Sequence, residues 1–68
     1  MFIVVELQKS AEGQVANIVT DHATQAEAES KYHQVLSSAA ISNLPCHSAV
    51  LLSEEGFPIE HKAYLHTA

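Results

Sequence analysis

Apolar residues follow two different spacings along this chain. Residues 2–9 are rich in β-branched and aromatic residues, and their side chains alternate between two faces, which is typical of a β-strand; residues 15–22, 46–53 and 59–66 are the other predicted strands. The first two segments are joined by residues 10–13 and the last two by residues 53–56, both with the pattern Ser-x-Glu-Gly. This composition favours a tight hairpin turn closed by a glycine in the left-handed region. The pattern therefore predicts two β-hairpins.

Between the hairpins, the apolar spacing is helical. The positions i, i+4, i+7, i+8 and i+11 carry one apolar stripe, formed by Ala28, Tyr32, Val35, Leu36 and Ala39. Thr24 and Glu27 form a capping-box pattern, which predicts a helix that begins near residue 25. Asn43 and Pro45 end it, because asparagine tolerates the left-handed cap and proline disfavours helix before it. A second line of small or polar residues runs beside the stripe, at Ala26, Ser30, His33, Ser37 and Ala40, and allows close approach of a partner or ligand.

These elements predict an α+β fold with the order ββαββ. Residues 1–68 form a single domain, in which an antiparallel sheet of two hairpins is covered on one face by one helix. A chain of this length buries only about 60% of its unfolded surface, so a second copy is an expected source of further stability. The strand order stays open, because the helix can connect the hairpins in more than one way.

Assigning faces to the strands indicates what the sheet has to bury. Turns closed by the two glycines place Val4 opposite Thr20, Val5 opposite Val19, Ile3 opposite Asp21 and Glu6 opposite Ile18. In the second hairpin the same reasoning predicts one face with Ala49, Leu51, Ile59 and Ala63, and another with Val50, Leu52 and Tyr64. One helix covers one face, so the other leaves an apolar patch that a homodimer, a higher oligomer or a ligand cleft would bury.

Charge and composition narrow the partners and the compartment. The net charge is −5 with only three lysines, which offers no basic stripe for nucleic acid or for an anionic membrane. A small phosphate-bearing ligand remains compatible, because backbone N–H groups bind anions. The chain has one cysteine, no recognisable secretory signal and no apolar run near the ~20 residues that span a bilayer, so we expect a cytoplasmic protein.

Metal and catalytic motifs are weak in this sequence. The five histidines lack the spacing of zinc ligands: His61 and His66 differ by five positions and point to opposite faces of a regular strand. Cys46 and His47 are strand neighbours that also diverge, and Glu27 and Glu29 lie about 200° apart on the helix. We therefore expect no metal, no cofactor, no catalytic residues and no enzymatic activity.

Two sets of polar and aromatic residues are candidates for a binding site. Lys31, Tyr32 and His33 lie together on the helix, and Lys62, Tyr64 and His66 lie on the last strand. Tyr32 either fills the core or stacks on a planar ring. Together, aromatic rings and hydrogen-bond donors suit a planar molecule that bears phosphate. The predicted ligand-binding residues are Lys31, Tyr32, His33, Tyr64 and His66.

The run AEAESKYHQVLSSAAISNLPCHSAVLLSEEG, with the opening FIVVELQ, resembles a family of very short bacteriophage and prophage proteins without an assigned role. The likeness lies in the opening strand, the EG turns, the KYH helix centre and the Pro-x-His strand entry. By size and context, it implies a phage-encoded anti-defence sponge in the host cytoplasm. Such proteins sequester nucleotide signals of bacterial immune systems such as Thoeris or CBASS, here at a site between subunits. The alternative is a homo-oligomeric interaction module whose open sheet face or edge blocks or recruits a host protein.

Overall fold

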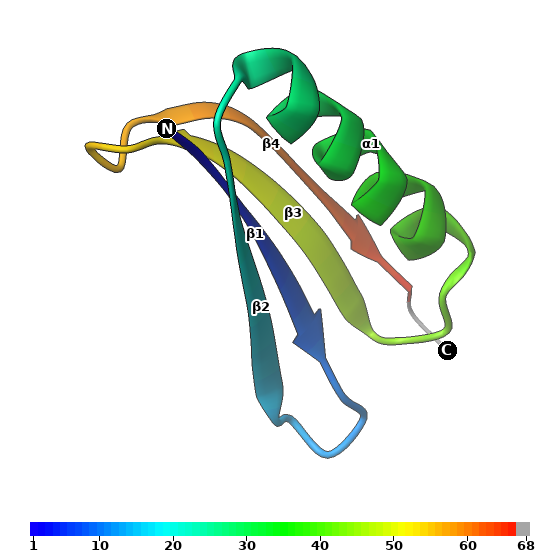
Figure 1. Ribbon diagram of the computed structural model, residues 1–68. Coiled ribbons are helices and arrows are strands. Elements are labelled where there is room, and N and C mark those ends of the chain that lie inside the picture. The colour runs from blue at the N-terminus through cyan, green and yellow to red at the C-terminus, as the bar shows by residue number, and fades with distance from the viewer. Residues whose placement is uncertain (67–68) are drawn as a thin grey trace.

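The computed structural model describes residues 1–66 and confirms the ββαββ order (Figure 1). The elements are β1 (Phe2–Lys9), β2 (Val15–His22), α1 (Gln25–Ile41), β3 (Cys46–Ser53) and β4 (Pro58–Leu65). The predicted bounds of the first three strands are correct, and β4 begins and ends one residue earlier than predicted. The backbone N–H of Glu27 donates to Thr24 Oγ1 over 3.2 Å, which is the predicted N-terminal cap of α1.

The four strands form one antiparallel sheet in the order β2-β1-β3-β4. The two most apolar strands, β1 and β3, therefore occupy the centre. Since β2 and β3 both run antiparallel to β1, they are parallel to each other, and α1 provides the long connection that parallel strands require. This order, which the sequence left open, places the helix across one face of the sheet (Figure 1).

The first hairpin has the regular register that its turn predicts. All four predicted pairs are confirmed, including Val4 with Thr20 and Glu6 with Ile18. Gly13 has φ = 87°, and its N–H donates to the Ser10 carbonyl over 3.0 Å. Glycine is favoured here because a Cβ is costly in the left-handed region.

The second hairpin repeats the turn but not the register. Gly56 has φ = 88°, and its N–H donates to the Ser53 carbonyl over 2.9 Å. Leu52 then pairs with Pro58 but Leu51 pairs with Glu60, so that one extra residue, Ile59, lies in β4 as a β-bulge.

The bulge reverses the predicted faces of β4. Ala63 pairs with Ser48 rather than sharing a face with Ala49 and Leu51, and Tyr64 pairs with His47. The predicted face assignment of Ala63 and Tyr64 was therefore wrong. The physical reason is that a shift of one residue moves every later side chain of a strand to the opposite face. The bulge thus turns Tyr64 toward α1.

The core lies between α1 and the centre of the sheet. The predicted helical stripe is confirmed: Ala28, Tyr32, Val35 and Ala39 are buried, and Leu36 packs at their edge. They contact side chains of β1 and β3, chiefly Val4, Ala49 and Leu51. No helix within residues 1–66 is long and apolar enough to cross a membrane.

The opposite side of the sheet has no cover in the single chain, and we call it the open face. Side chains alternate along a strand, so the residues between the core positions lie here. The solvent-accessible fraction is 63% for Val15, 59% for Val19 and 72% for Leu65. The apolar members of the open face are Ile3, Val5, Leu7, Val15, Val19, Val50, Leu52, Ala63 and Leu65.

Candidate functional site

A cleft of about 550 Å³ lies between one flank of α1 and the edge strand β4. Its helix wall is formed by Tyr32, His33, Leu36, Ser37 and Ala40. Its strand wall is formed by Glu60, His61, Lys62 and Tyr64. Two features of the sequence produce this cleft. The small side chains of Ser37 and Ala40 leave room on the helix flank, and the bulge turns alternate residues of β4 toward α1.

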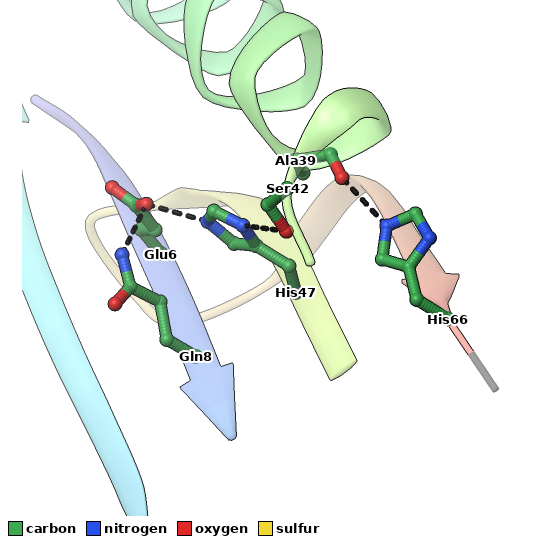
Figure 2. A network of polar contacts seen from close by, with 6 residues as sticks. All are labelled: Glu6, Gln8, Ala39, Ser42, His47 and His66. Atoms are coloured by element: carbon green, nitrogen blue, oxygen red, sulfur yellow. Dashed lines mark hydrogen bonds and ion pairs between the residues drawn. The ribbon is translucent and has the colours of Figure 1, made fainter. Parts of the chain in front are cut away.

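Aromatic rings line the cleft and are held by neighbouring groups. The ring centroids of Tyr32 and His33 are 5.4 Å apart, with an interplanar angle of 67°. The Tyr64 ring lies 5.1 Å from Lys62 Nζ, within cation–π range. On its other side it stacks on His66, with centroids 6.2 Å apart and planes 5° from parallel. His66 Nε2 in turn donates to the Ala39 carbonyl over 2.9 Å, so the end of β4 is tied to the last turn of α1 (Figure 2).

The electrostatics of the cleft combine one carboxylate with nitrogen donors. Burial raises the pKa of the Tyr32 phenol, and the nearby Glu60 carboxylate and Tyr64 raise it further. Tyr32 therefore remains a neutral hydrogen-bond donor at physiological pH. Lys62 contributes a positive charge, and His33 contributes an imidazole at an exposed position. Such a lining accepts a hydrogen-bond donor near Glu60 and an anionic group near Lys62.

The structure brings together three of the five residues predicted to bind a ligand. Tyr32, His33 and Tyr64 line the cleft, but Tyr32 is only 4% exposed and belongs to the core, which favours its core interpretation over a stacking role. Lys31 does not line it: its charge acts on Glu6 of β1, on the other flank of α1. His66 does not line it either but supports Tyr64 from behind.

The prediction missed Glu60 and the small residues Ser37 and Ala40 as parts of this site. The signal for Ser37 and Ala40 was present, because both belong to the line of small residues beside the apolar stripe. No comparable signal identified Glu60. It faces α1 only because of the bulge that precedes it in β4.

No family model, curated protein or solved structure matched the chain. The chemistry of the site therefore rests on its own geometry. Among residues 1–66, no group of three or more His, Cys, Asp or Glu side chains is arranged to hold a metal ion.

A second polar cluster joins α1, β1 and β3 on the helix side of the sheet (Figure 2). His47, only 4% exposed, places Nε2 2.6 Å from Glu6 Oε2 and Nδ1 3.1 Å from Ser42 Oγ. Gln8 Nε2 donates to the same Glu6 oxygen over 2.8 Å. Burial by itself would raise the pKa of Glu6, but hydrogen bonds from Gln8 and His47, with the charges of His47 and Lys31, lower it.

This cluster has the atoms of a serine–histidine–carboxylate chain, a feature that the sequence did not reveal. The close contact with Glu6 favours a proton on His47 Nε2, which leaves Nδ1 to accept from the Ser42 hydroxyl. However, Ser42 is the C-terminal cap of α1, where the helix dipole is negative and opposes an oxyanion. The α1–β4 cleft does not include Ser42. We therefore interpret the cluster as a tether between the helix end and the central strands.

Proposed function

We propose that this protein is a non-enzymatic binding protein whose α1–β4 cleft holds a small nucleotide-type ligand. The observation that carries the proposal is the convergence of two aromatic side chains, Tyr32 from the helix and Tyr64 from the strand, with Lys62 on one cleft. A volume of about 550 Å³ falls in the usual range of small-molecule sites, which is roughly 300–1,000 Å³.

The lining suits a ligand with three different parts. A planar base would stack on the face of Tyr64 that Lys62 Nζ covers in the free chain, and the lysine would then be free to reach the phosphate. An exocyclic amine or a ribose hydroxyl would donate to Glu60, and a phosphate would accept from Lys62 and His33. The Glu60 carboxylate only accepts hydrogen bonds, and a nucleotide offers it donors in an exocyclic amine or a ribose hydroxyl, which a simple dicarboxylate lacks.

In this proposal, the protein acts by sequestration and leaves its ligand intact. The likeness to short phage proteins supports a role as an anti-defence sponge that binds a nucleotide-derived immune signal in the host cytoplasm. The sequence suggested a site between subunits. We instead assign the site to one chain, because α1 and β4 of the same chain supply both aromatic rings.

The test is a titration of the purified protein with cyclic oligonucleotides and cyclic ADP-ribose, monitored by melting temperature and calorimetry. We expect one of these probes to bind, and AMP to bind more weakly. Tyr64→Leu should raise the Kd at least about fivefold because it removes the stacking ring. Lys62→Met should raise it about tenfold. Lys31→Met is the matched control, because Lys31 lies outside the cleft and its loss should leave the Kd within about twofold.

A second measurement identifies the ligand without choosing it in advance. The protein is incubated with lysate of cells whose immune signalling has been activated, re-purified and heated, and the released molecules are analysed by mass spectrometry. Recovery of an intact nucleotide in fixed ratio to the chain supports sequestration. A protein that stays empty in lysate and shows no shift with any probe would refute the proposal.

A second candidate function is supported by the exposure of β2. Residues Val15 to Val19 are exposed on both faces of this edge strand, and Ile18 is 48% exposed although it lies on the helix side. Unpaired backbone groups at such an edge can add a strand from another protein. Under this alternative, a host protein binds the β2 edge. Capture of one host protein from lysate, lost when Asn17 is replaced by proline, would support this function over nucleotide binding.

A further inference from the structure

We infer that the open face is the interface with a second copy of this chain, related by a two-fold axis that runs across the strands. The open face and the cleft lie on opposite sides of the sheet and meet at the edge strand β4, where His61 and Lys62 line both the cleft and the hollow of the open face. The outer strands contribute the most exposed apolar side chains, with Val15, Val19 and Leu65 all more than half accessible. The same apolar surface on both copies suits an isologous contact.

The area of the open face is sufficient for such a contact. Each of the four strands has eight residues. With a rise of ~3.4 Å per residue and a strand spacing of ~4.8 Å, the face measures roughly 19 by 27 Å. Treated as flat, two such faces together bury on the order of 1,000 Å², and the uneven surface of the side chains adds to this area. A specific interface requires about 1,000 Å². Sheets that pack in this way keep their strand directions within about 30° of each other.

Charge complementarity selects the direction of the axis. The open face carries one acid, Asp21, near one end of β2 and one lysine, Lys9, at the opposite end of the neighbouring β1. Asp21 pairs with Ile3, three residues before Glu6, and Lys9 lies three residues after Glu6. A two-fold axis that crosses the strands at the level of Glu6 exchanges the two ends of the sheet. Asp21 of one copy then lies over the end of the second copy that carries Lys9. Asp21 and Lys9 then form two reciprocal ion pairs between the copies. An axis parallel to the strands would instead place Asp21 over β4 of the second copy.

The relief of the open face fits the same axis. A hollow of about 380 Å³ lies between β3 and β4 on this side, where the paired side chains of Ser48 and Ala63 are small. Val50 pairs with Val5, one residue before Glu6, and Ser48 pairs with Leu7, one residue after it. The rotation that joins the charges therefore also places Val50 of each copy over the hollow of the other. Large side chains then face small ones.

The test is sedimentation equilibrium of the full chain and its charge variants at micromolar concentrations. We expect a dimer, and Lys9→Asp or Asp21→Lys should each raise the dimer Kd about tenfold because two reciprocal pairs become repulsive. The double variant K9D/D21K should restore the Kd to within about twofold of the original. Glu29→Lys is the control for Asp21→Lys, with the same change of charge but on α1, on the other side of the sheet.

Circular dichroism and the melting temperature establish that each variant is folded. Val50→Glu places a charge over the partner's hollow and should leave only monomer. A monomer at every concentration, or a dimer that Val50→Glu does not weaken, overturns the proposed interface. A dimer in which K9D/D21K is as weak as the single variants overturns the proposed axis.

Discussion

The two hairpins begin alike and end differently. Both have eight-residue strands and a Ser-x-Glu-Gly turn, with glycine φ angles of 87° and 88°. Both close with the same hydrogen bond, from Ser10 N–H to Gln14 O over 2.8 Å and from Ser53 N–H to Phe57 O over 2.9 Å. Beyond the turn, β2 keeps its register on β1, whereas β4 gains the extra residue Ile59. Identical turns therefore do not ensure identical sheet faces.

This difference decides which hairpin carries the candidate site. The β1–β2 hairpin places Thr20 and Ile18 on the helix side, and its turn extends past α1 into solvent (Figure 1). The β3–β4 hairpin places Glu60, Lys62 and Tyr64 there, beside the helix. The one extra residue in β4 thus changes which of its alternating side chains face α1, and the edge strand becomes a wall of the cleft. Bulges are known to redirect side chains near functional sites in this way.

The largest expected effect tests how unequally the hairpins contribute to the core. Leu51 of β3 has no exposed surface, so Leu51→Ala should lower the free energy of unfolding by about 2–5 kcal/mol. Ile18 of β2 also lies on the helix side but is 48% exposed, and Ile18→Ala should cost about 1 kcal/mol. Urea unfolding of both variants measures the difference. Equal losses would show that α1 covers both hairpins to the same extent.

Removal of the bulge should convert the second hairpin to the register of the first. Deletion of Ile59 removes the unpaired residue and leaves Leu51 paired with Glu60 and His47 paired with Tyr64, so Tyr64 should stay on the helix side of a regular hairpin. The nuclear Overhauser effects between the Tyr64 ring and α1 should therefore persist. Ile59→Val is the control, because it keeps the chain length and therefore the bulge. Loss of the contacts between Tyr64 and α1 in the deletion variant would show that Ile59 is not the extra residue.

The Glu6–His47 contact joins the two hairpins and should make their association sensitive to acid. Because the folded-state pKa of Glu6 is lowered, its stabilisation is present above the unfolded pKa, about 4.3, and is lost as the pH falls through the folded value. Glu6→Gln should cost about 1–2 kcal/mol at neutral pH and should flatten the acid side of the stability curve. Urea unfolding between pH 3 and pH 7 measures the loss of stability at neutral pH and the slope of the curve on the acid side. Glu12→Gln in the exposed turn is the control. A Glu6→Gln curve parallel to that of the original chain would contradict the assignment.

The smallest effect tests whether the turns are equivalent. A Cβ at Gly13 or Gly56 would meet no atom within 4 Å, so the cost of alanine is conformational only. Gly13→Ala and Gly56→Ala should each cost about 1 kcal/mol, because alanine disfavours positive φ. The two losses, measured by thermal unfolding, should agree within about 0.5 kcal/mol. A clearly larger loss at Gly56 would mean that the turn and the bulge act together.

The sequence predicted the elements well because each depends on neighbouring residues. The helical stripe around Tyr32 and Val35, the capping Thr24 and the turn glycines are local signals, and the structure confirms them. The register of the first hairpin followed from its turn alone. The bulge at Ile59 was missed because it depends on cross-strand pairing, which the turn sequence does not reveal.

Only part of the candidate site was accessible from the sequence. Successive helical residues point about 100° apart, so Lys31 and His33 diverge from Tyr32 to opposite flanks, and only one flank faces β4. Without the strand order, neither flank could be preferred. The buried position of His47, bonded to Glu6 and Ser42, likewise requires that β1 and β3 are neighbours.

The sequence by itself determined the four strands, the helix, the two glycine turns and the apolar stripe, because periodicity and turn chemistry act over a few residues. The tertiary structure decided the strand order, the sheet face on which Tyr64 lies and which residues line the cleft together with Tyr32. These features join residues that are distant in the chain. They depend on which pairing of the strands buries the most apolar surface. A single extra residue in one strand is enough to change the sheet face of every side chain that follows it.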